Sequence, residues 1–399
     1  MAAAGALRRP SPSIDGPSRP PNPADTLSLS IARMEFPAAE PIARALQDYG
    51  ARRAFGYVLE SYRHDPAARD DVGDLVVDRM YARFRWKISR DDVVYTPGVL
   101  AALNVACQIV ASESAGIVVQ SPIYPPLLRI PRNANLDART AELRRSADGS
   151  YAIDRDDFER ALTSTTGAFV LCNPHNPLGR VYRREELEWL AQLCLARGIL
   201  ILSDEIHSDI LFDGHQHIPV ASLGPEVADS TITFLGPSKT FNLAGLHGAF
   251  AIVTNAERRR AYKEALSRLM LSVCAPAIVA AEAAYRHGGP WLEDLLADLD
   301  DNRRFLSSYL GRELPGIRMT VPEGTYLAWL DCRALALENP CTFFLEQARI
   351  ALADGASFGP GGEGFVRMTF AVTRPTLEEG LRRISAVLHD RPRDYERNT

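Results

Sequence analysis

Short, continuously apolar runs alternate with helical patterns through the first two thirds of this chain. The apolar runs are Val93–Tyr95, Ala115–Gln120, Ala168–Cys172, Ile199–Leu202, Thr231–Leu235 and Ala249–Val253, and helical patterns span 41–49, 99–110 and 185–197. A continuous apolar run suits a strand that is buried on both faces, as in parallel sheets covered by helices. The sequence therefore predicts an α/β fold whose large domain holds a mixed, mostly parallel sheet of the seven-stranded type, flanked by helices.

The pattern changes beyond about residue 285, where a long leucine-rich helical pattern is followed by two further apolar runs, 326–330 and 365–370. A closing helix passes through Leu377, Leu381 and Ile384. These features predict a smaller α+β C-terminal domain. The expected division is a disordered tail over 1–25, an N-terminal segment over 26–45 joining the small domain, a large domain over 46–284 and a small domain over 285–399.

The composition excludes several classes of protein. A net charge of −5 gives no electrostatic reason to expect nucleic acid or anionic membranes as partners. No apolar run approaches the length that spans a bilayer, and the N-terminal charges follow the short apolar stretch instead of preceding it, unlike a secretory signal. The six cysteines are scattered without a CxxC pair, which favours reduced thiols in a cytoplasmic protein, and we expect no metal site.

A lone lysine, Lys239, stands in the apolar, glycine-punctuated segment 233–245, and Asp204 ends the expected strand 199–202. Ligands of open α/β sheets sit outside the carboxyl ends of the strands. Pyridoxal phosphate needs a lysine that forms an imine and a carboxylate that pairs with its pyridinium nitrogen. Lys239 is therefore the predicted catalytic residue, both covalent anchor and proton-shuttling base. The alternatives are a surface loop lysine and, for Asp204, a helix N-cap.

Three further residues are candidates to contact the ring of this cofactor. Asn176 lies in a turn dense in Asn, Pro and Gly after an expected strand, and His207 follows Asp204 by three residues. The side chain of either residue could reach the phenolic oxygen of the cofactor. The alternative for Asn176 is a plain turn, which a segment of this composition forms in any case. The alternative for His207 is a histidine packed in the core. Tyr124, in a proline-flanked loop, could stack on the pyridine ring.

The phosphate and the substrate would need contacts of their own. Gly98, Val99 and Leu100 begin an expected helix, whose free N–H groups and dipole would bind the phosphate. We also expect Ser238, next to the lysine, among the cofactor contacts. Arg367 lies in an otherwise apolar strand and needs a partner if buried; a small amino-acid substrate would supply its α-carboxylate, and an internal salt bridge is the alternative.

Together these motifs resemble the fold-type I pyridoxal-phosphate enzymes of the class I/II aminotransferase superfamily. The segments 173–181, 203–209, 237–246 and 322–331 resemble its cystathionine β-lyase (cysteine C–S lyase) branch. The resemblance implies a homodimer with a shared active site, in which Tyr57 reaches the phosphate of the neighbouring subunit and Arg367 binds the substrate carboxylate. It also implies β-elimination from a cysteine thioether or S-conjugate, which yields a thiol, pyruvate and ammonia.

The chain departs from this family's pattern near the expected substrate. Gly236 replaces the usual phosphate-binding serine, and Thr369 replaces an asparagine. The segment 30–36 loses an aromatic residue and an acid and gains Arg33, which with Ala32 is expected to lie near the substrate. These departures suggest a specialised substrate or an altered outcome.

Three other functions remain open. An aminotransferase would use the same lysine, aspartate and arginine, and decarboxylation with oxidative deamination of an S-conjugated cysteine would leave an aldehyde. A non-catalytic regulator would bind the cofactor as a ligand, but the 25-residue tail is too short for an added DNA-binding domain.

Overall fold

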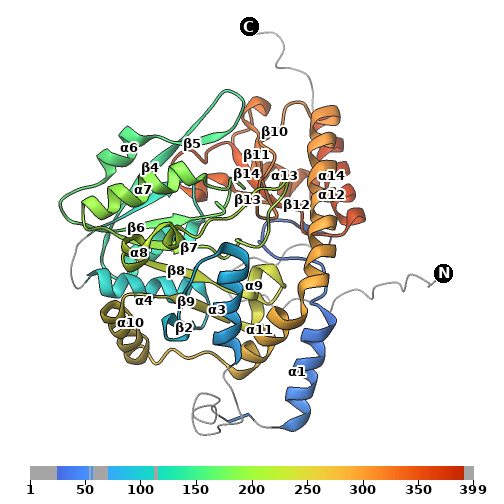
Figure 1. Cartoon of the computed structure of the whole chain (residues 1–399). Coiled ribbons are helices and arrows are strands. Elements are labelled where there is room, and N and C mark those ends of the chain that lie inside the picture. The colour runs from blue at the N-terminus through green and yellow to red at the C-terminus, as the bar shows by residue number, and fades with distance from the viewer. Residues whose placement is uncertain (1–24, 54, 57–70, 112–115, 391–399) are drawn as a thin grey trace.

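The computed structural model describes residues 25–53, 55–56, 71–111 and 116–390. Tyr57 and residues 1–24 of the expected tail over 1–25 lie outside the described residues. In Figure 1 the large sheet lies between α6 (Arg155–Ala161) and α7 (Arg184–Ala196) on one face and α4 (Val99–Ala111) and α10 (Ala256–Arg268) on the other. Two separate apolar clusters fill these two helix–sheet layers. The arrangement is the covered sheet that the apolar runs predict.

The large sheet has eight strands within the described residues, in the order β2-β9-β8-β7-β6-β3-β4-β5. They are β2 (Val93–Thr96), β3 (Gly116–Ser121), β4 (Asp137–Arg145), β5 (Tyr151–Ile153), β6 (Thr166–Cys172), β7 (Leu200–Asp204), β8 (Thr231–Leu235) and β9 (Ala249–Ile252). The central strands are parallel, whereas β9 is antiparallel to both β8 and β2.

The sheet has one strand more than the expected seven, because β5 extends it as the antiparallel hairpin partner of β4. Periodicity did not identify β4, whose sequence is largely polar and exposed since it lies near the edge of the sheet. The predicted fold class is otherwise confirmed. Helices that sequence patterns did not assign include α3 (Asp71–Phe84), α5 (Pro125–Asn133), α8 (Pro225–Asp229), α11 (Ala275–His287) and α13 (Pro340–Ala348).

The C-terminal part forms its own antiparallel sheet in the order β10-β11-β14-β13. Its strands are β10 (Arg318–Met319), β11 (Leu327–Asp331), β13 (Ala353–Asp354) and β14 (Phe365–Thr369), packed with α12 (Gly289–Glu313) and α14 (Arg374–His389). At the other end of the chain, β1 (Leu27–Ser28) pairs in parallel with β12 (Ile350–Ala351). The exact domain boundaries stay a prediction.

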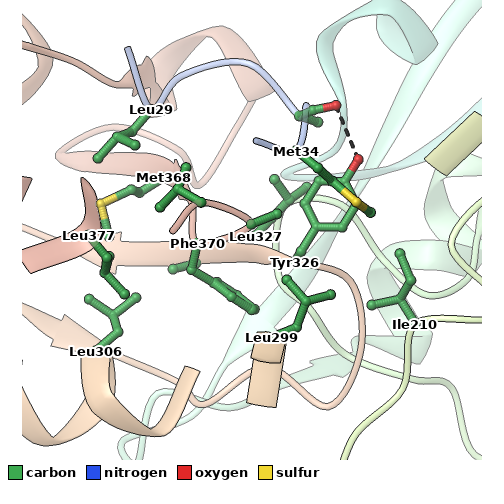
Figure 2. Close-up of a cluster of buried hydrophobic side chains, with 14 of the residues drawn as sticks. Leu29, Met34, Ile210, Leu299, Leu306, Tyr326, Leu327, Met368, Phe370 and Leu377 are labelled. Atoms are coloured by element: carbon green, nitrogen blue, oxygen red, sulfur yellow. Dashed lines mark hydrogen bonds between the residues drawn. The ribbon is translucent and has the colours of Figure 1, made fainter. Parts of the chain in front are cut away.

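Buried apolar side chains hold the N-terminal segment against the C-terminal part. Figure 2 shows Leu29 and Met34 of this segment in one cluster with Tyr326, Met368 and Phe370, which lie on or directly beside strands β11 and β14 of the C-terminal sheet. Burying one large apolar side chain contributes roughly 1.5–3 kcal/mol. The segment is therefore anchored firmly before it continues into α1 (Glu40–Arg52), which packs on α11. In the described part of the chain, no helix combines the length and apolarity that crossing a bilayer requires.

Candidate active site

The candidate residues gather because several strands end at one edge of the sheet. Strands β3, β6, β7 and β8 are mutually parallel, so their carboxyl ends meet at this edge. Tyr124 follows β3, Asn176 follows β6, Asp204 ends β7, and Lys239 follows β8 on the short helix α9 (Pro237–Thr240). This is the edge at which open α/β sheets bind ligands.

The start of α4 reaches the same edge by a different route. Strand β2 is antiparallel to β9, which is antiparallel to β8, so β2 runs in the direction of the parallel strands. Its carboxyl end leads through Gly98, whose φ of +100° favours glycine, into Val99 at the start of α4. No acidic residue lies in the first turn of α4, which leaves the positive end of the helix dipole available for an anion.

A cavity of about 380 Å³ opens at this edge, within the usual range for small-molecule sites. Its lining contains most of the expected contacts: Ala32, Gly98, Val99, Leu100, Tyr124, Asn176, Asp204, His207, Ser238 and Lys239. Ala32 and Lys239, which are 207 positions apart in the sequence, therefore line the same cavity.

Lys239 is half-buried and lines this cavity. Its Nζ donates a hydrogen bond of 2.8 Å to the carbonyl oxygen of Ala32. Burial lowers the pKa of the Lys239 amine to about 8, Arg367 adds to the effect, and the Asp204 carboxylate opposes it. A lysine with such a pKa exists partly as the neutral amine near neutral pH, which a nucleophile or proton acceptor requires.

Asp204 fits the positively charged ring nitrogen that pyridoxal phosphate carries. Burial raises the pKa of its carboxyl group to about 7, and the backbone N–H of Ile206, 3.2 Å from Oδ1, partly opposes this. Within the described residues, no cation forms a direct ion pair with Asp204, although it faces the cavity. A cation bound there would restore the ionised form, because an opposite charge nearby favours it.

His207 is buried beside Asp204 and stays neutral. Burial, together with Lys239 and Arg367, lowers the pKa of its imidazole to about 3. Its ring packs edge-on against Tyr326 with the centroids 5.6 Å apart, and its Nδ1 is buried without a hydrogen-bond partner among the described residues. His207 is therefore packed in the core, as the alternative expected, and also keeps a ring nitrogen that lacks a hydrogen-bond partner among the described residues.

Arg367 lies on β14 and carries a charge that no described carboxylate neutralises. Its Nη1 donates to Oδ1 of Asn176 at 3.0 Å and its Nη2 to the carbonyl oxygen of Ser30 at 2.7 Å, while Nε is buried without a partner. Burial lowers the pKa of the guanidinium to about 10, so the group is still cationic at neutral pH. A buried cation held only by neutral acceptors is suited to bind a carboxylate.

A second cavity, of about 440 Å³, adjoins the first and shares Ala32, Tyr124 and Lys239 with it. Its remaining lining comes from the N-terminal segment and from the region around β13: Ser30, Ile31, Cys341, Leu352, Ala353, Asp354, Ser357 and Arg367. The side chain of Arg33 is exposed and lines neither cavity. Its carbonyl oxygen accepts a hydrogen bond from Thr369 Oγ1 at 3.3 Å, so these two departures from the family pattern contact each other.

Seven residues line the first cavity that were not among the predicted contacts: Pro97, Ala101, Cys172, Ile206, Ala244, His247 and Gly248. His247 lies two residues before β9, which is antiparallel to both of its neighbouring strands, so its place at this edge depends on a strand direction that periodicity cannot predict. Gly236 is closely packed, because a Cβ there would lie 3.0 Å from Ala249 Cα and 3.1 Å from the carbonyl oxygen of Gly248, so a side chain would require the neighbouring backbone to shift by a few tenths of an ångström.

Comparison with known proteins agrees with this geometry. The family model described as aminotransferase class I and II matches residues 25–384. The chain belongs to this family. It is 38% identical over 369 residues to cystathionine β-lyase PatB of Bacillus subtilis, covering 91% of this chain and 93% of that protein.

Solved structures of the family share the fold-type I architecture of this chain. Cystalysin from Treponema denticola, which contains pyridoxal 5′-phosphate, superposes with a TM-score of 0.86 at 29% identity and 92% coverage of both chains. The pyridoxal-phosphate-bound C–S lyase from Staphylococcus hominis gives a TM-score of 0.83 at 28% identity, covering 91% of this chain and 92% of that one. Among the described residues, no cluster of His, Cys, Asp or Glu is suited to a metal ion.

Proposed function

We propose that this protein is a pyridoxal-phosphate-dependent C–S β-lyase that cleaves a cysteine thioether or S-conjugate. The observation that carries the proposal is that three groups line two adjoining cavities. These groups are Lys239 with a lowered pKa, the buried Asp204 without an ion-pair partner among the described residues, and the cation Arg367 without a carboxylate partner among them. The relationship to cystathionine β-lyase PatB and to C–S lyases supports it. Pyridoxal phosphate would supply the electron sink that stabilises a carbanion at the substrate Cα.

Three residues of this chain would then have separate roles in the reaction. Arg367 would hold the substrate α-carboxylate through paired N–H groups, and Asp204 would keep the ring nitrogen protonated. Lys239 would accept the Cα proton at Nζ, after which the Cβ–S bond breaks and its electron pair leaves with the sulfur as a thiolate. Water would then release the three-carbon remainder as pyruvate and ammonia.

The assembly and compartment belong to the same proposal. We infer a homodimer, as the family resemblance implies, in which the partner subunit's Tyr57 contacts the phosphate. All six cysteines are free, which fits a reducing cytoplasmic compartment.

We further propose that the substrate is specialised. The wall of the second cavity combines the apolar Ile31 and Leu352 with the polar Asp354, and the sulfur substituent would lie against it. Thr369 holds the backbone of Arg33, the residue that follows the cavity-lining Ala32. Ordinary activity on cystathionine, with no better substrate among larger S-conjugates, would contradict this point.

The test is a panel of S-substituted cysteines, incubated with the cofactor-loaded protein and analysed by mass spectrometry with and without an acceptor 2-oxo acid. Free thiol and pyruvate without acceptor are the expected result, and Lys239→Ala should abolish them. A thioether-bearing 2-oxo acid that requires the acceptor would instead mean an aminotransferase, the alternative that the family's breadth favours. A thioether-bearing aldehyde would mean oxidative deamination.

A further inference from the structure

The second cavity carries groups of opposite charge that do not pair with each other. Among the described residues of its lining, Arg367 and Lys239 are basic and Asp354 is the only acid. The guanidinium of Arg367 donates to Asn176 and to the backbone of Ser30, and it forms no ion pair with a described carboxylate. The cavity therefore offers a cationic and an anionic position to one bound molecule.

The carboxylate of Asp354 lies where two segments of the cavity wall meet. Its Oδ1 accepts a hydrogen bond of 3.2 Å from the backbone N–H of Ala356, and its Oδ2 accepts one of 3.3 Å from Nδ2 of Asn339. Ala356 directly precedes Ser357, and Asn339 lies two residues before Cys341; both Ser357 and Cys341 line the cavity. Both donors to the carboxylate are neutral, and within the described part of the chain no cation pairs with it. A bound cation can therefore supply the missing counter-charge.

The amino-acid end of the proposed substrate does not provide this cation. Its α-carboxylate would bind Arg367, and its α-amino group would be engaged by pyridoxal phosphate. The remaining part of a cysteine conjugate is the substituent on the sulfur, which would have to carry the charge that meets Asp354. Ile31 and Leu352 add apolar surface to the same cavity, which suits the methylene groups of such a substituent.

We propose that Asp354 is a specificity-determining residue, which selects cysteine S-conjugates whose substituent ends in a cationic group, such as an amine, on a short apolar stem. The inference rests on the proposed function, because it describes the substituent of that substrate. An acidic side chain at the end of the cavity favours a cationic substituent and disfavours an anionic one. For a half-buried carboxylate the effect on affinity is roughly fivefold.

The experiment compares three cysteine conjugates of similar length and different charge on the cofactor-loaded protein. S-aminopropyl-cysteine ends in a cation, S-butyl-cysteine is neutral and S-carboxypropyl-cysteine ends in an anion. Rapid mixing measures each dissociation constant from the change in the visible absorbance of the bound cofactor, and thiol release is measured separately. In Asp354→Asn, the affinity for the aminopropyl conjugate should fall roughly fivefold, the affinity for the carboxypropyl conjugate should rise, and the affinity for the butyl conjugate should stay unchanged.

Two features of the design separate charge from structural damage. Asp354 caps the short 3₁₀ helix η5 (Gly355–Phe358) through its contact with Ala356, and asparagine caps a helix as well as aspartate does. Glu338→Gln is the matched control, because it removes an exposed acid beside Asn339 that does not line the cavity. This control should leave all three affinities as in the wild type.

The outcomes distinguish this inference from the proposed function. Equal changes for the three conjugates in Asp354→Asn, an unchanged profile in that variant, or the same profile in Glu338→Gln would each overturn the inference. Thiol release that does not depend on the charge of the substituent would refute the inference alone. The expected affinities without any thiol release would refute the proposed function but leave the recognition of the cation by Asp354 intact.

Discussion

At the scale of single residues, the site contains ionisable groups whose burial favours the neutral form over the charged form that they ordinarily have at neutral pH. Burial raises the pKa of Asp204 to about 7 and lowers that of Lys239 to about 8, so both titrate close to neutral pH. Shifts of this kind are typical of catalytic groups. In the cofactor-free protein, ionising these buried groups therefore costs free energy, and a bound cofactor would reduce this cost by supplying an opposite charge to Asp204.

Replacing Asp204 with asparagine should stabilise the cofactor-free protein at alkaline pH while abolishing turnover. The folded-state pKa of about 7 lies above the unfolded value, so the cost of ionising Asp204 develops as pH rises from about 4 and is complete above about pH 7. We expect a gain of about 1–3 kcal/mol at pH 8 and little at pH 4 in urea unfolding. A gain that is the same at both pH values would contradict this assignment.

At the scale of elements, a buried carboxylate ties the lysine helix α9 to α3. Asp209 accepts a hydrogen bond from Thr240 Oγ1 at 2.9 Å and forms ion pairs with Arg79 at 2.7 Å and Arg83 at 3.1 Å, one turn apart on α3. The two arginines hold the pKa of Asp209 below its usual value despite burial. Lys239 directly precedes Thr240, so this cluster fixes the helix that carries the reactive amine.

Asp209→Asn should destabilise the protein by about 3 kcal/mol, because two arginines lose their buried counter-charge. Thr240→Val, which removes one hydrogen bond and keeps the ion pairs, should cost only about 1 kcal/mol. Chemical denaturation of both variants at neutral pH measures the difference. Equal losses would mean that the ion pairs contribute nothing beyond the hydroxyl contact.

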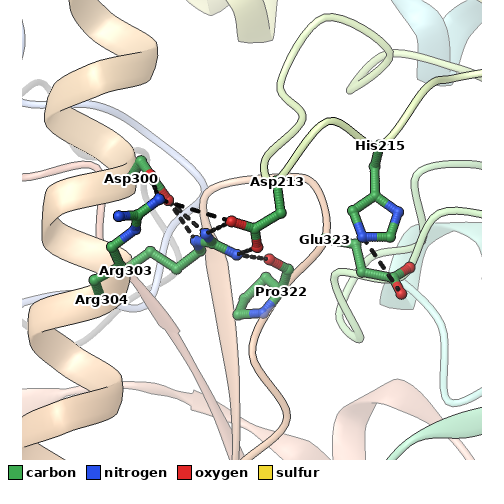
Figure 3. Close-up of polar contacts among 7 residues, drawn as sticks. All are labelled: Asp213, His215, Asp300, Arg303, Arg304, Pro322 and Glu323. Atoms are coloured by element: carbon green, nitrogen blue, oxygen red, sulfur yellow. Dashed lines mark hydrogen bonds and ion pairs between the residues drawn. The ribbon is translucent and has the colours of Figure 1, made fainter.

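At the scale of the whole molecule, Arg303 connects α12 to the loop that follows β7. Figure 3 shows its guanidinium between Asp213, Asp300 and the carbonyl oxygen of Pro322. Its side chain is only 2% exposed, and both Asp213 oxygens bind it, at 2.6 and 2.8 Å. Arg303 therefore joins α12 of the C-terminal part to the loop that follows β7 of the large sheet.

Arg303→Lys should lower the free energy of unfolding by about 2 kcal/mol, since an ammonium group cannot reproduce the planar, bidentate contact. Arg304→Ala is the matched control, because Arg304 is 66% exposed and shares the same two aspartates. It should change stability by less than about 1 kcal/mol. Thermal unfolding of the two variants compares them directly, and a larger loss for Arg304→Ala would refute the role given to Arg303.

The sequence by itself predicted the central strands of the large sheet and the chemistry of the site. Continuous apolar runs identified the central strands because both faces of those strands are buried, and the segments around Asp204 and Lys239 indicated the cofactor because its chemistry requires those groups. The strand β4, next to the edge of the sheet, was not detected, since a largely exposed and polar strand has no apolar signature.

Only the tertiary structure decided which residues share the cavity. The antiparallel direction of β9 brings His247 to the cavity, and the crossing of the N-terminal segment sets the Ala32 carbonyl against Lys239. Side chains that alternate or recur along a sequence reveal burial, but they carry no information about strand direction or about contacts between distant segments. Strand order and chain crossing therefore determined the surroundings of residues whose chemical identity was already evident from the sequence.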